Sequence, residues 1–96
     1  MKNFAQGSNA MASYSLIFDK RVLKKDLPPI PAKDRKKILT KIDQLSLNPY
    51  PTDSIQLTGS TVRRIRQGNY RILYQVNDSS ITVYVVRVGH RSVVYR

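Results

Sequence analysis

Arginines recur at alternate positions within the stretch TVRRIRQGNYRILYQV, residues 61–76. Side chains alternate between the two faces of a strand, so Arg64 and Arg66 share one face. The Gly68-Asn69 pair between two strand-like runs predicts a two-residue hairpin turn, because such a turn needs a residue that accepts positive φ. On the return strand, Arg71 can join the same side of the sheet. Three guanidinium groups on one side of a small sheet predict a polyanion site.

A second group of candidate residues follows the last predicted strand. His90 and Arg91 come directly after Gly89, and Tyr95 lies four residues beyond Arg91. Arginine contacts to phosphate supply affinity for nucleic acid, and an aromatic ring offers a stacking surface for a base. Glutamate is absent and the aspartates lie away from the basic cluster in sequence. The general base of a catalytic site is therefore not an obvious carboxylate. Peripheral contacts to phosphate are expected from Arg63, Arg87, Lys33 and Lys37.

The charge balance points to the same kind of partner. Seventeen Lys and Arg face six acidic residues, all of them Asp, which gives a formal net charge of +11. From Ile55 onward the chain has seven arginines, no lysine and a single acid, Asp78. Such a surface favours nucleic acid, or an acidic protein that covers it. A merely solvated basic surface is the alternative.

Composition excludes several other classes of site. With no cysteine and one histidine, thiolate metal sites and disulfides are excluded and a histidine-based metal cluster is not expected, so we expect no metal and no cofactor. No apolar run approaches the ~20 residues that span a bilayer, and the N-terminus lacks the order of a secretory signal. We expect a cytoplasmic protein without a membrane partner.

The elements that position these residues follow from periodicity. Residues 14–18 predict a strand, and residues 20–27 a short helix with Val22 and Leu23 turned inward. A long helix is predicted from Pro31 or Ala32 to about Leu47, with Ile38, Ile42 and Leu45 buried and Leu39 widening the apolar stripe. Asn48-Pro49 ends it. Residues 50–60 are expected to form a loop.

The last part of the chain predicts a three-strand antiparallel meander, with its final strand over residues 81–88 and stopped by Gly89. The expected fold is a small α+β domain, with two N-terminal helices packed on one face of an antiparallel β-sheet and a basic concave opposite face. Residues 1–13 are expected to be a flexible tail, and residues 14–96 the domain.

Several motifs, in this order along the chain, resemble the RelE family of toxins within the RelE/ParE superfamily. The resemblance covers residues 14–95, including the long helix that ends in Leu47-Asn48-Pro49. The motifs are Leu57-x-Gly59, Arg64-Ile65-Arg66-x-Gly68-x-Tyr70-Arg71-Ile72-x-Tyr74, and Val88-Gly89-His90-Arg91 followed by Val94-Tyr95.

The resemblance implies a type II toxin that enters the ribosomal A site, meets 16S rRNA and cuts mRNA there by 2′-hydroxyl attack. It implies a metal-independent endoribonuclease, and thus an inhibitor of translation. Arg64 and Arg66 take the places of two basic strand residues, Arg71 is expected to stabilise the transition state, and Arg91 the phosphate or leaving group. Tyr95 matches a tyrosine that stacks on or orients the base. His90 stands where the best-known member has lysine, and is a candidate general acid.

The resemblance also implies a cognate, RelB-like antitoxin, with operator DNA bound only through the complex of the two proteins. Two alternatives remain open. One is a ParE-like toxin that inhibits DNA gyrase without nuclease activity, which a supercoiling assay would detect. The other is a non-toxic basic RNA-binding protein, which normal growth on overexpression would favour.

Overall fold

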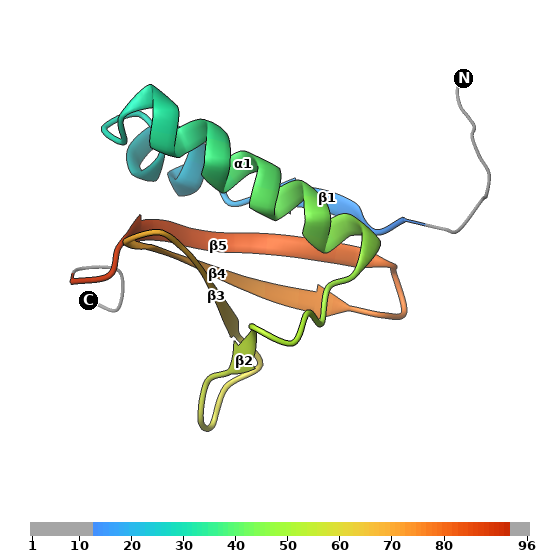
Figure 1. The fold of residues 1–96 in the computed structure, drawn as a ribbon. Coiled ribbons are helices and arrows are strands. Elements are labelled where there is room, and N and C mark those ends of the chain that lie inside the picture. Colours follow the sequence, from blue (N-terminus) through green and yellow to red (C-terminus); the bar gives the residue numbers. More distant parts are fainter. Residues whose placement is uncertain (1–12, 93–96) are drawn as a thin grey trace, which may run out of the picture.

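The computed structural model describes residues 13–92, which fold as helices above a five-stranded sheet (Figure 1). The elements are β1 (Ser15–Phe18), the π-helix η1 (Val22–Asp26), α1 (Ala32–Leu47), β2 (Ile55–Gln56), β3 (Arg63–Gln67), β4 (Tyr70–Asn77) and β5 (Thr82–His90). No helix in this part of the chain is long and apolar enough to cross a membrane.

Helix α1 begins and ends where its sequence predicts. Pro31 is the N-cap, and Asn48 leaves the helical region with φ −147° and ψ 98°, because the residue before a proline avoids the α conformation. The predicted stripe of Ile38, Ile42 and Leu45 is buried. The inward placement of Leu39 is wrong, since that side chain is 38% exposed.

The short first helix is present as a π-helix, η1, preceded by a helical turn at residues 20 and 21. Its wider turn is closed by a 2.9 Å hydrogen bond from Leu27 N–H to the Val22 carbonyl, five residues back. Val22 and Leu27 are therefore the buried residues of this segment. Leu23 is 53% exposed, so its predicted burial is wrong.

The sheet has the strand order β1-β5-β4-β3-β2. The predicted all-antiparallel sheet is wrong at one edge, because β1 pairs with β5 in parallel, from Ser15 opposite Thr82 to Phe18 opposite Val85. The helices carry the chain away from β1, so it need not return as a hairpin. The predicted loop over residues 50–60 contains one strand, β2, which pairs with β3 over two residues.

Strand β5 runs further than its sequence indicates. Gly89 does not stop it; the strand continues to His90, with Gly89 opposite Arg71 of β4. The register shifts between Leu73 and Tyr74, so that β5 carries one extra residue at Val86. A glycine is tolerated within this strand because both neighbouring residues are paired with β4.

The hairpin between β3 and β4 is confirmed. Gln67 pairs with Tyr70 across a two-residue turn, and Gly68 has φ +61°. A positive φ at the first central residue alone fits a type II′ turn, in which glycine holds that position. The turn fixes which residues of β3 and β4 lie side by side, and therefore which arginines meet.

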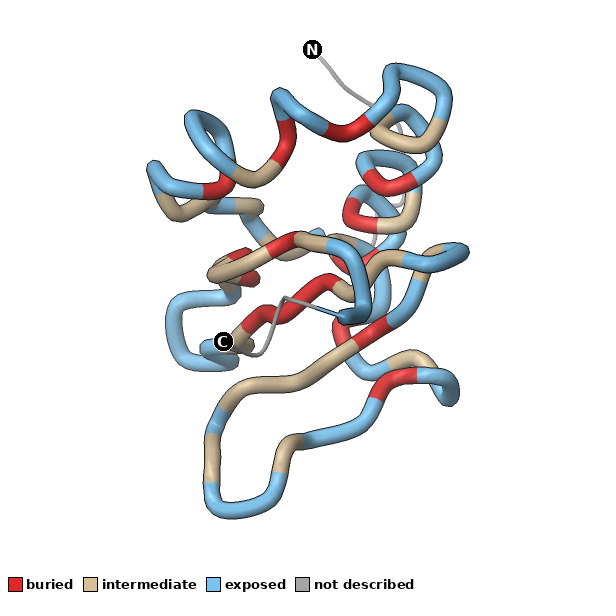
Figure 2. Tube along the Cα trace, turned by 90° about the vertical axis from the view of Figure 1, so that its left-hand side faces the viewer, coloured by how far each residue is buried: buried red, intermediate tan, exposed pale blue. Residues whose placement is uncertain are grey.

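The core lies between the helical segments and one face of the sheet. Figure 2 shows the buried positions gathered in the helices and in the middle of the strands, with no buried position in the β2–β3 connection at residues 57–62. The buried cluster is formed by Val22, Leu27, Ile30, Ile38, Ile42, Leu45, Ile65, Ile72, Tyr74, Val83, Val85 and Val88. We call the sheet face that carries this cluster the helix face, and the other the open face.

Candidate functional site

Three arginines share the open face of the sheet at its hairpin end. Arg66 lies directly opposite Arg71, and Arg64 opposite Leu73. Directly opposed residues of an antiparallel pair point to the same face. Their neighbours Ile65 and Ile72 are buried on the helix face, so the arginines face away from the helices. This placement agrees with the alternation predicted from the sequence. We call Arg64, Arg66 and Arg71 the arginine set.

Arg91 is tied to the same end of the sheet through its backbone. Its N–H donates to the Asn69 carbonyl at 2.9 Å, and its carbonyl accepts from Arg71 Nη1 at 2.9 Å. Both peptide groups of Arg91 are thus held by the β3–β4 hairpin. The structure therefore brings Arg91 to the arginine set, although 20 residues separate it from Arg71.

Tyr95 lies outside the residues that the structure describes, so its predicted stacking role stays a prediction. Within residues 13–92, no cluster of three or more His, Cys, Asp or Glu is arranged to hold a metal ion.

His90 lies on the other face from Arg71. It pairs with Tyr70, which packs against the buried cluster on the helix face. The two rings meet edge to face, with centroids 5.9 Å apart and an interplanar angle of 82°. His90 Nδ1 lies 3.3 Å from the backbone nitrogen of Ser92, which donates to it, and 2.9 Å from Ser92 Oγ. The sheet therefore separates His90 from the arginine set.

Arg63 and Arg87 are engaged within the fold. Arg63 Nη2 donates to Ser54 Oγ at 2.9 Å, and its guanidinium lies 5.1 Å from the centroid of the Tyr50 ring. Arg87 Nε pairs with Asp26 Oδ2 at 3.3 Å. These contacts fasten the loop after α1 to β3 and η1 to β5. A role for either side chain in binding RNA stays a prediction.

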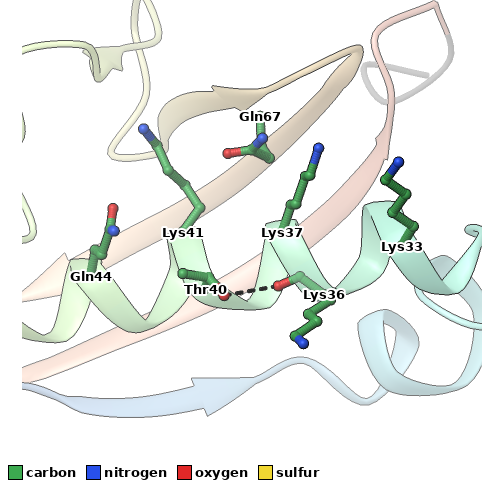
Figure 3. Close-up of a pocket in the computed structure, with 7 residues that line it drawn as sticks. All are labelled: Lys33, Lys36, Lys37, Thr40, Lys41, Gln44 and Gln67. Carbon is green, nitrogen blue, oxygen red and sulfur yellow. Dashed lines mark hydrogen bonds between the residues drawn. The ribbon is translucent and has the colours of Figure 1, made fainter.

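Lysines of α1 line an open groove of about 560 Å³. Figure 3 shows Lys33, Lys37 and Lys41 projecting from one side of the helix, with Gln67 of β3 across from them. Lys41 donates to Asp53 Oδ2 at 2.9 Å, and this hydrogen bond lowers the pKa of the Asp53 carboxyl. The predicted phosphate-binding residues Lys33 and Lys37 therefore belong to a second basic surface, which is separate from the arginine set.

At the end of the sheet opposite the β3–β4 hairpin, the carboxylate of Asp78 accepts hydrogen bonds from two tyrosine hydroxyls. Tyr14 and Tyr50 donate to the two oxygens of Asp78 at 2.6 and 2.7 Å. The hydrogen bonds from Tyr14 and then Tyr50 lower the pKa of Asp78, and the bond to Asp78 raises the pKa of Tyr50 to about 12. Asp78 joins the β4–β5 turn to β1 and to the loop after α1, which is a structural role that sequence reasoning missed.

Comparison with known proteins identifies the family. The model of the family described as "ParE toxin of type II toxin-antitoxin system, parDE" matches residues 16–95. Toxin RelG of Mycobacterium tuberculosis is 48% identical over 31 residues, which are 32% of this chain and 36% of that toxin. The matched segment thus spans about a third of the length of that curated relative.

Solved structures share the fold over nearly their whole length. The archaeal RelE–RelB complex from Pyrococcus horikoshii has a chain with a TM-score of 0.74 and 28% identity, covering 84% of this chain and 98% of that one. The intact E. coli RelBE toxin–antitoxin complex gives a TM-score of 0.70 and 28% identity, with 81% and 96% covered. The RelB–RelE complex from Methanococcus jannaschii gives 0.65 and 33%, with 82% and 94% covered.

The fold and these matches together define a class of protein, the RelE-like toxins of type II toxin–antitoxin systems. The chain belongs to the ParE toxin family, within the RelE/ParE superfamily.

Proposed function

We propose that this toxin is a ribosome-dependent endoribonuclease that cleaves mRNA in the A site and so inhibits translation. The observation that carries the proposal is the arginine set together with Arg91, which the hairpin ties to the same end of the sheet. The structural similarity to RelE toxins supports the same activity. The positive charges of four arginines at one end of a small sheet are complementary to the negative phosphates of an RNA backbone.

The cleavage needs a nucleophile that RNA itself supplies. The 2′-hydroxyl gives up its proton as O2′ forms a bond to the adjacent phosphorus, while the bond from phosphorus to O5′ breaks and O5′ takes up a proton, so that the step has no net gain or loss of protons. The products are a 2′,3′-cyclic phosphate and a 5′-hydroxyl. Charge that develops on the phosphorane is stabilised by positioned guanidinium donors. This chemistry requires no metal-bound water.

Within this proposal, Arg64 and Arg66 bind the phosphates that flank the scissile bond. Arg71 and Arg91 stabilise the phosphorane, and Tyr95 stacks on the base. Because His90 lies on the helix face, we assign it no part in the cleavage step. The basic open face acts here as the surface that receives mRNA, in contact with 16S rRNA of the A site.

The test is a toeprint of a defined mRNA on ribosomes, with the wild type beside Arg71→Ala and Tyr95→Phe. Arg21 has an exposed side chain and directly precedes η1, so Arg21→Ala is the control for the loss of one positive charge. Cleavage in the A-site codon that Arg71→Ala abolishes and Arg21→Ala retains supports the proposal, and a 2′,3′-cyclic phosphate end supports the route through the 2′-hydroxyl. Blocked translation without cleavage would instead define a ribosome-binding inhibitor.

The match to the ParE family model favours a second candidate, a toxin that inhibits DNA gyrase. The two candidates differ in target and not in fold. A supercoiling assay with purified gyrase separates them. Inhibition of supercoiling by a protein that leaves mRNA intact on ribosomes would replace the endoribonuclease proposal.

We further propose a RelB-like antitoxin as the protein partner, because the structural relatives are complexes of RelE with RelB. An acidic or arginine-capping segment of the antitoxin covers the open face, and operator DNA is bound only through the complex. Surface ion pairs weaken as salt rises. We therefore expect the toxin–antitoxin affinity to fall with ionic strength, and an affinity that is insensitive to salt would show that apolar contacts dominate.

A further inference from the structure

Three side chains form a row across the hairpin end of the helix face. Gln67 pairs with Tyr70, and Tyr70 pairs with His90 on its other side. They belong to β3, β4 and β5 in turn, so that the row crosses three adjacent strands. Gln67 and Tyr70 are partly exposed, and His90 is exposed. We call these three residues the end row.

One side of the end row borders a cleft of about 340 Å³. Tyr70 and His90 line it, and so do the apolar residues Pro29 and Ile30 of the loop after η1. Lys25 of η1 also lines it. In the described part of the chain, neither the Tyr70 hydroxyl nor the Lys25 ammonium has a hydrogen-bond partner. The cleft therefore combines aromatic surface with an open hydroxyl and a cation.

The carboxylate in this cleft is already neutralised. Asp26 Oδ2 accepts from Val88 N–H at 2.9 Å and from Arg87 Nε at 3.3 Å, and its side chain is 8% exposed. The acid that could repel a polyanion is thus paired with Arg87. Lys25 leaves the surroundings of the cleft positively charged.

The other side of the end row borders the lysine groove of α1. Gln67 lines that groove together with Lys33 and Lys37 (Figure 3). Four residues along an α-helix advance by about 6 Å, so Lys33 and Lys37 stand one turn apart on the same side. A basic helix side, an amide and two aromatic rings therefore follow one another around the end of the sheet.

From this arrangement we propose that the end row is a second RNA-contact site, which takes bases of single-stranded RNA beyond the scissile bond. Tyr70 and His90 offer ring surface to a base, while Lys25, Lys33 and Lys37 contact phosphates. Cations that track a backbone beside aromatic rings are the usual means of binding single strands. The inference rests on the proposed function, because it takes the same RNA as the substrate.

The end row and the arginine set are close enough for one RNA strand to meet both. Arg66 and Gln67 are consecutive residues of β3 and point to opposite faces, and Arg91, which follows His90, is held through its backbone by Arg71. A strand on the open face reaches the end row by passing the Gly68-Asn69 turn. The site is thus an extension of the substrate surface around the edge of the sheet.

The test measures binding of a short fluorescent RNA whose 2′-hydroxyls are replaced by hydrogen, so that it cannot be cleaved, in the absence of ribosomes. His90→Ala and Gln67→Ala remove exposed or partly exposed side chains, and Tyr70→Leu keeps an apolar residue against the core. Leu47→Ala, which removes a large exposed apolar side chain at the end of α1 and outside the end row, is the matched control. Loss of stacking on one base weakens binding about fivefold or more.

A second arm of the binding experiment tests whether the end row recognises a base of the oligonucleotide. The same oligonucleotide is prepared with successive abasic positions, and each is bound to the wild type and to His90→Ala. At the position that contacts the end row, we expect loss of the base to lower the affinity of the wild type for the oligonucleotide. The same loss should not lower the affinity of His90→Ala any further. Equal affinity of wild type and His90→Ala for the intact oligonucleotide, with both folded, overturns the inference.

The outcomes separate this inference from the proposed function. Cleavage on ribosomes together with unchanged oligonucleotide binding in His90→Ala refutes the end row alone. Base-dependent binding through His90 without any ribosomal cleavage refutes the nuclease and retains the RNA site. An end row whose substitution weakens antitoxin binding but leaves RNA binding unchanged would be a protein contact, and the inference would be wrong.

Discussion

Arg71 of β4 donates through Nη1 to the carbonyl oxygen of Arg91 at 2.9 Å, so one arginine holds the backbone of another. The second hold on Arg91 is the bond from its N–H to the Asn69 carbonyl, also 2.9 Å. Removal of Arg71 therefore subtracts a charge from the open face and also releases the backbone that follows β5. A loss of activity in Arg71→Ala has both causes.

The two effects can be separated by hydrogen exchange. We expect Arg71→Ala to speed exchange of the Arg91 amide about fivefold, because a hydrogen bond of about 1 kcal/mol next to it is lost. Arg66→Ala removes an equal charge from the directly opposed position and should leave this amide unchanged. The measurement is NMR-detected amide exchange of the free protein. Equal exchange rates in both variants would show that Arg71 does not hold Arg91 in solution.

Tyr74 should be the tyrosine whose hydroxyl matters most for stability. It is fully buried, and its hydroxyl donates to the Pro49 carbonyl at 2.8 Å, joining the end of α1 to β4. Tyr74→Phe leaves that carbonyl without its donor, at a cost of about 1–2 kcal/mol. For a domain of this size the expected fall in Tm is about 5–10 °C.

The matched control for Tyr74 is Tyr84→Phe. The Tyr84 hydroxyl donates to Asp19 Oδ2 at 2.7 Å in a partly buried setting, where water replaces the lost partner more easily. Calorimetry should give a smaller fall in Tm for this variant. A fall as large as that of Tyr74→Phe would show that burial of the acceptor does not set the cost.

Asp26 should be important because it closes an open strand edge. Strand β1 covers β5 only over Thr82–Val85, and further along Asp26 Oδ2 accepts the Val88 N–H at 2.9 Å. Asp26→Ala leaves that N–H and Arg87 unpaired, at a cost of about 2 kcal/mol. Asp26→Asn retains an oxygen acceptor and should cost about half as much. Chemical denaturation of the two variants checks the order, and the reverse order would contradict it.

The bond between Tyr50 and Asp78 should limit stability at both ends of the pH range. The hydrogen bonds from Tyr14 and Tyr50 lower the pKa of Asp78, so its contribution is present above the usual carboxyl pKa and is lost as pH falls through the lowered value. The pKa of Tyr50 is raised to about 12. Its contribution is complete below about pH 10 and is lost as pH rises toward 12.

The measurement for this pair is Tm as a function of pH in Asp78→Asn and the wild type. We expect the Tm of Asp78→Asn near pH 7 to be lower than that of the wild type by a few degrees at most, since the pair is exposed. Below pH 4, the Tm of Asp78→Asn should fall less steeply with pH than that of the wild type. Asp43→Asn, an exposed carboxylate of α1, is the control for the loss of one negative charge. Parallel curves for wild type and Asp78→Asn would contradict the assignment.

Local signals in the sequence predicted the elements that position the arginine set. The alternation of Arg64, Ile65 and Arg66 and the Gly68 turn together determine the face and the register, and the spacing of Ile38, Ile42 and Leu45 determines how α1 packs. The family resemblance is confirmed by the match to residues 16–95. These features depend on residues that are near one another in the chain.

Features that depend on distant residues were not predicted. The parallel pairing of β1 with β5 joins residues 67 apart, such as Ser15 and Thr82, and no local pattern encodes it. The separation of His90 from Arg71 depends on the register across β4 and β5, which the extra residue Val86 shifts. Assigning β5 beyond Gly89 would have revealed it, since consecutive residues of a strand point to opposite faces.

The position of β5 in the sheet has a consequence for how the protein folds during its synthesis. This strand comes after the other four described strands in the chain, yet it lies between β1 and β4 and supplies Val83, Val85 and Val88 to the core. A nascent chain that ends before Thr82 has the partner of β1 missing and one edge of β4 uncovered. Because the native sheet needs these non-local pairings, the toxin fold is completed only when β5 leaves the exit tunnel. The translating ribosome is thus exposed to a finished toxin only after β5 has left its exit tunnel and paired with β1 and β4.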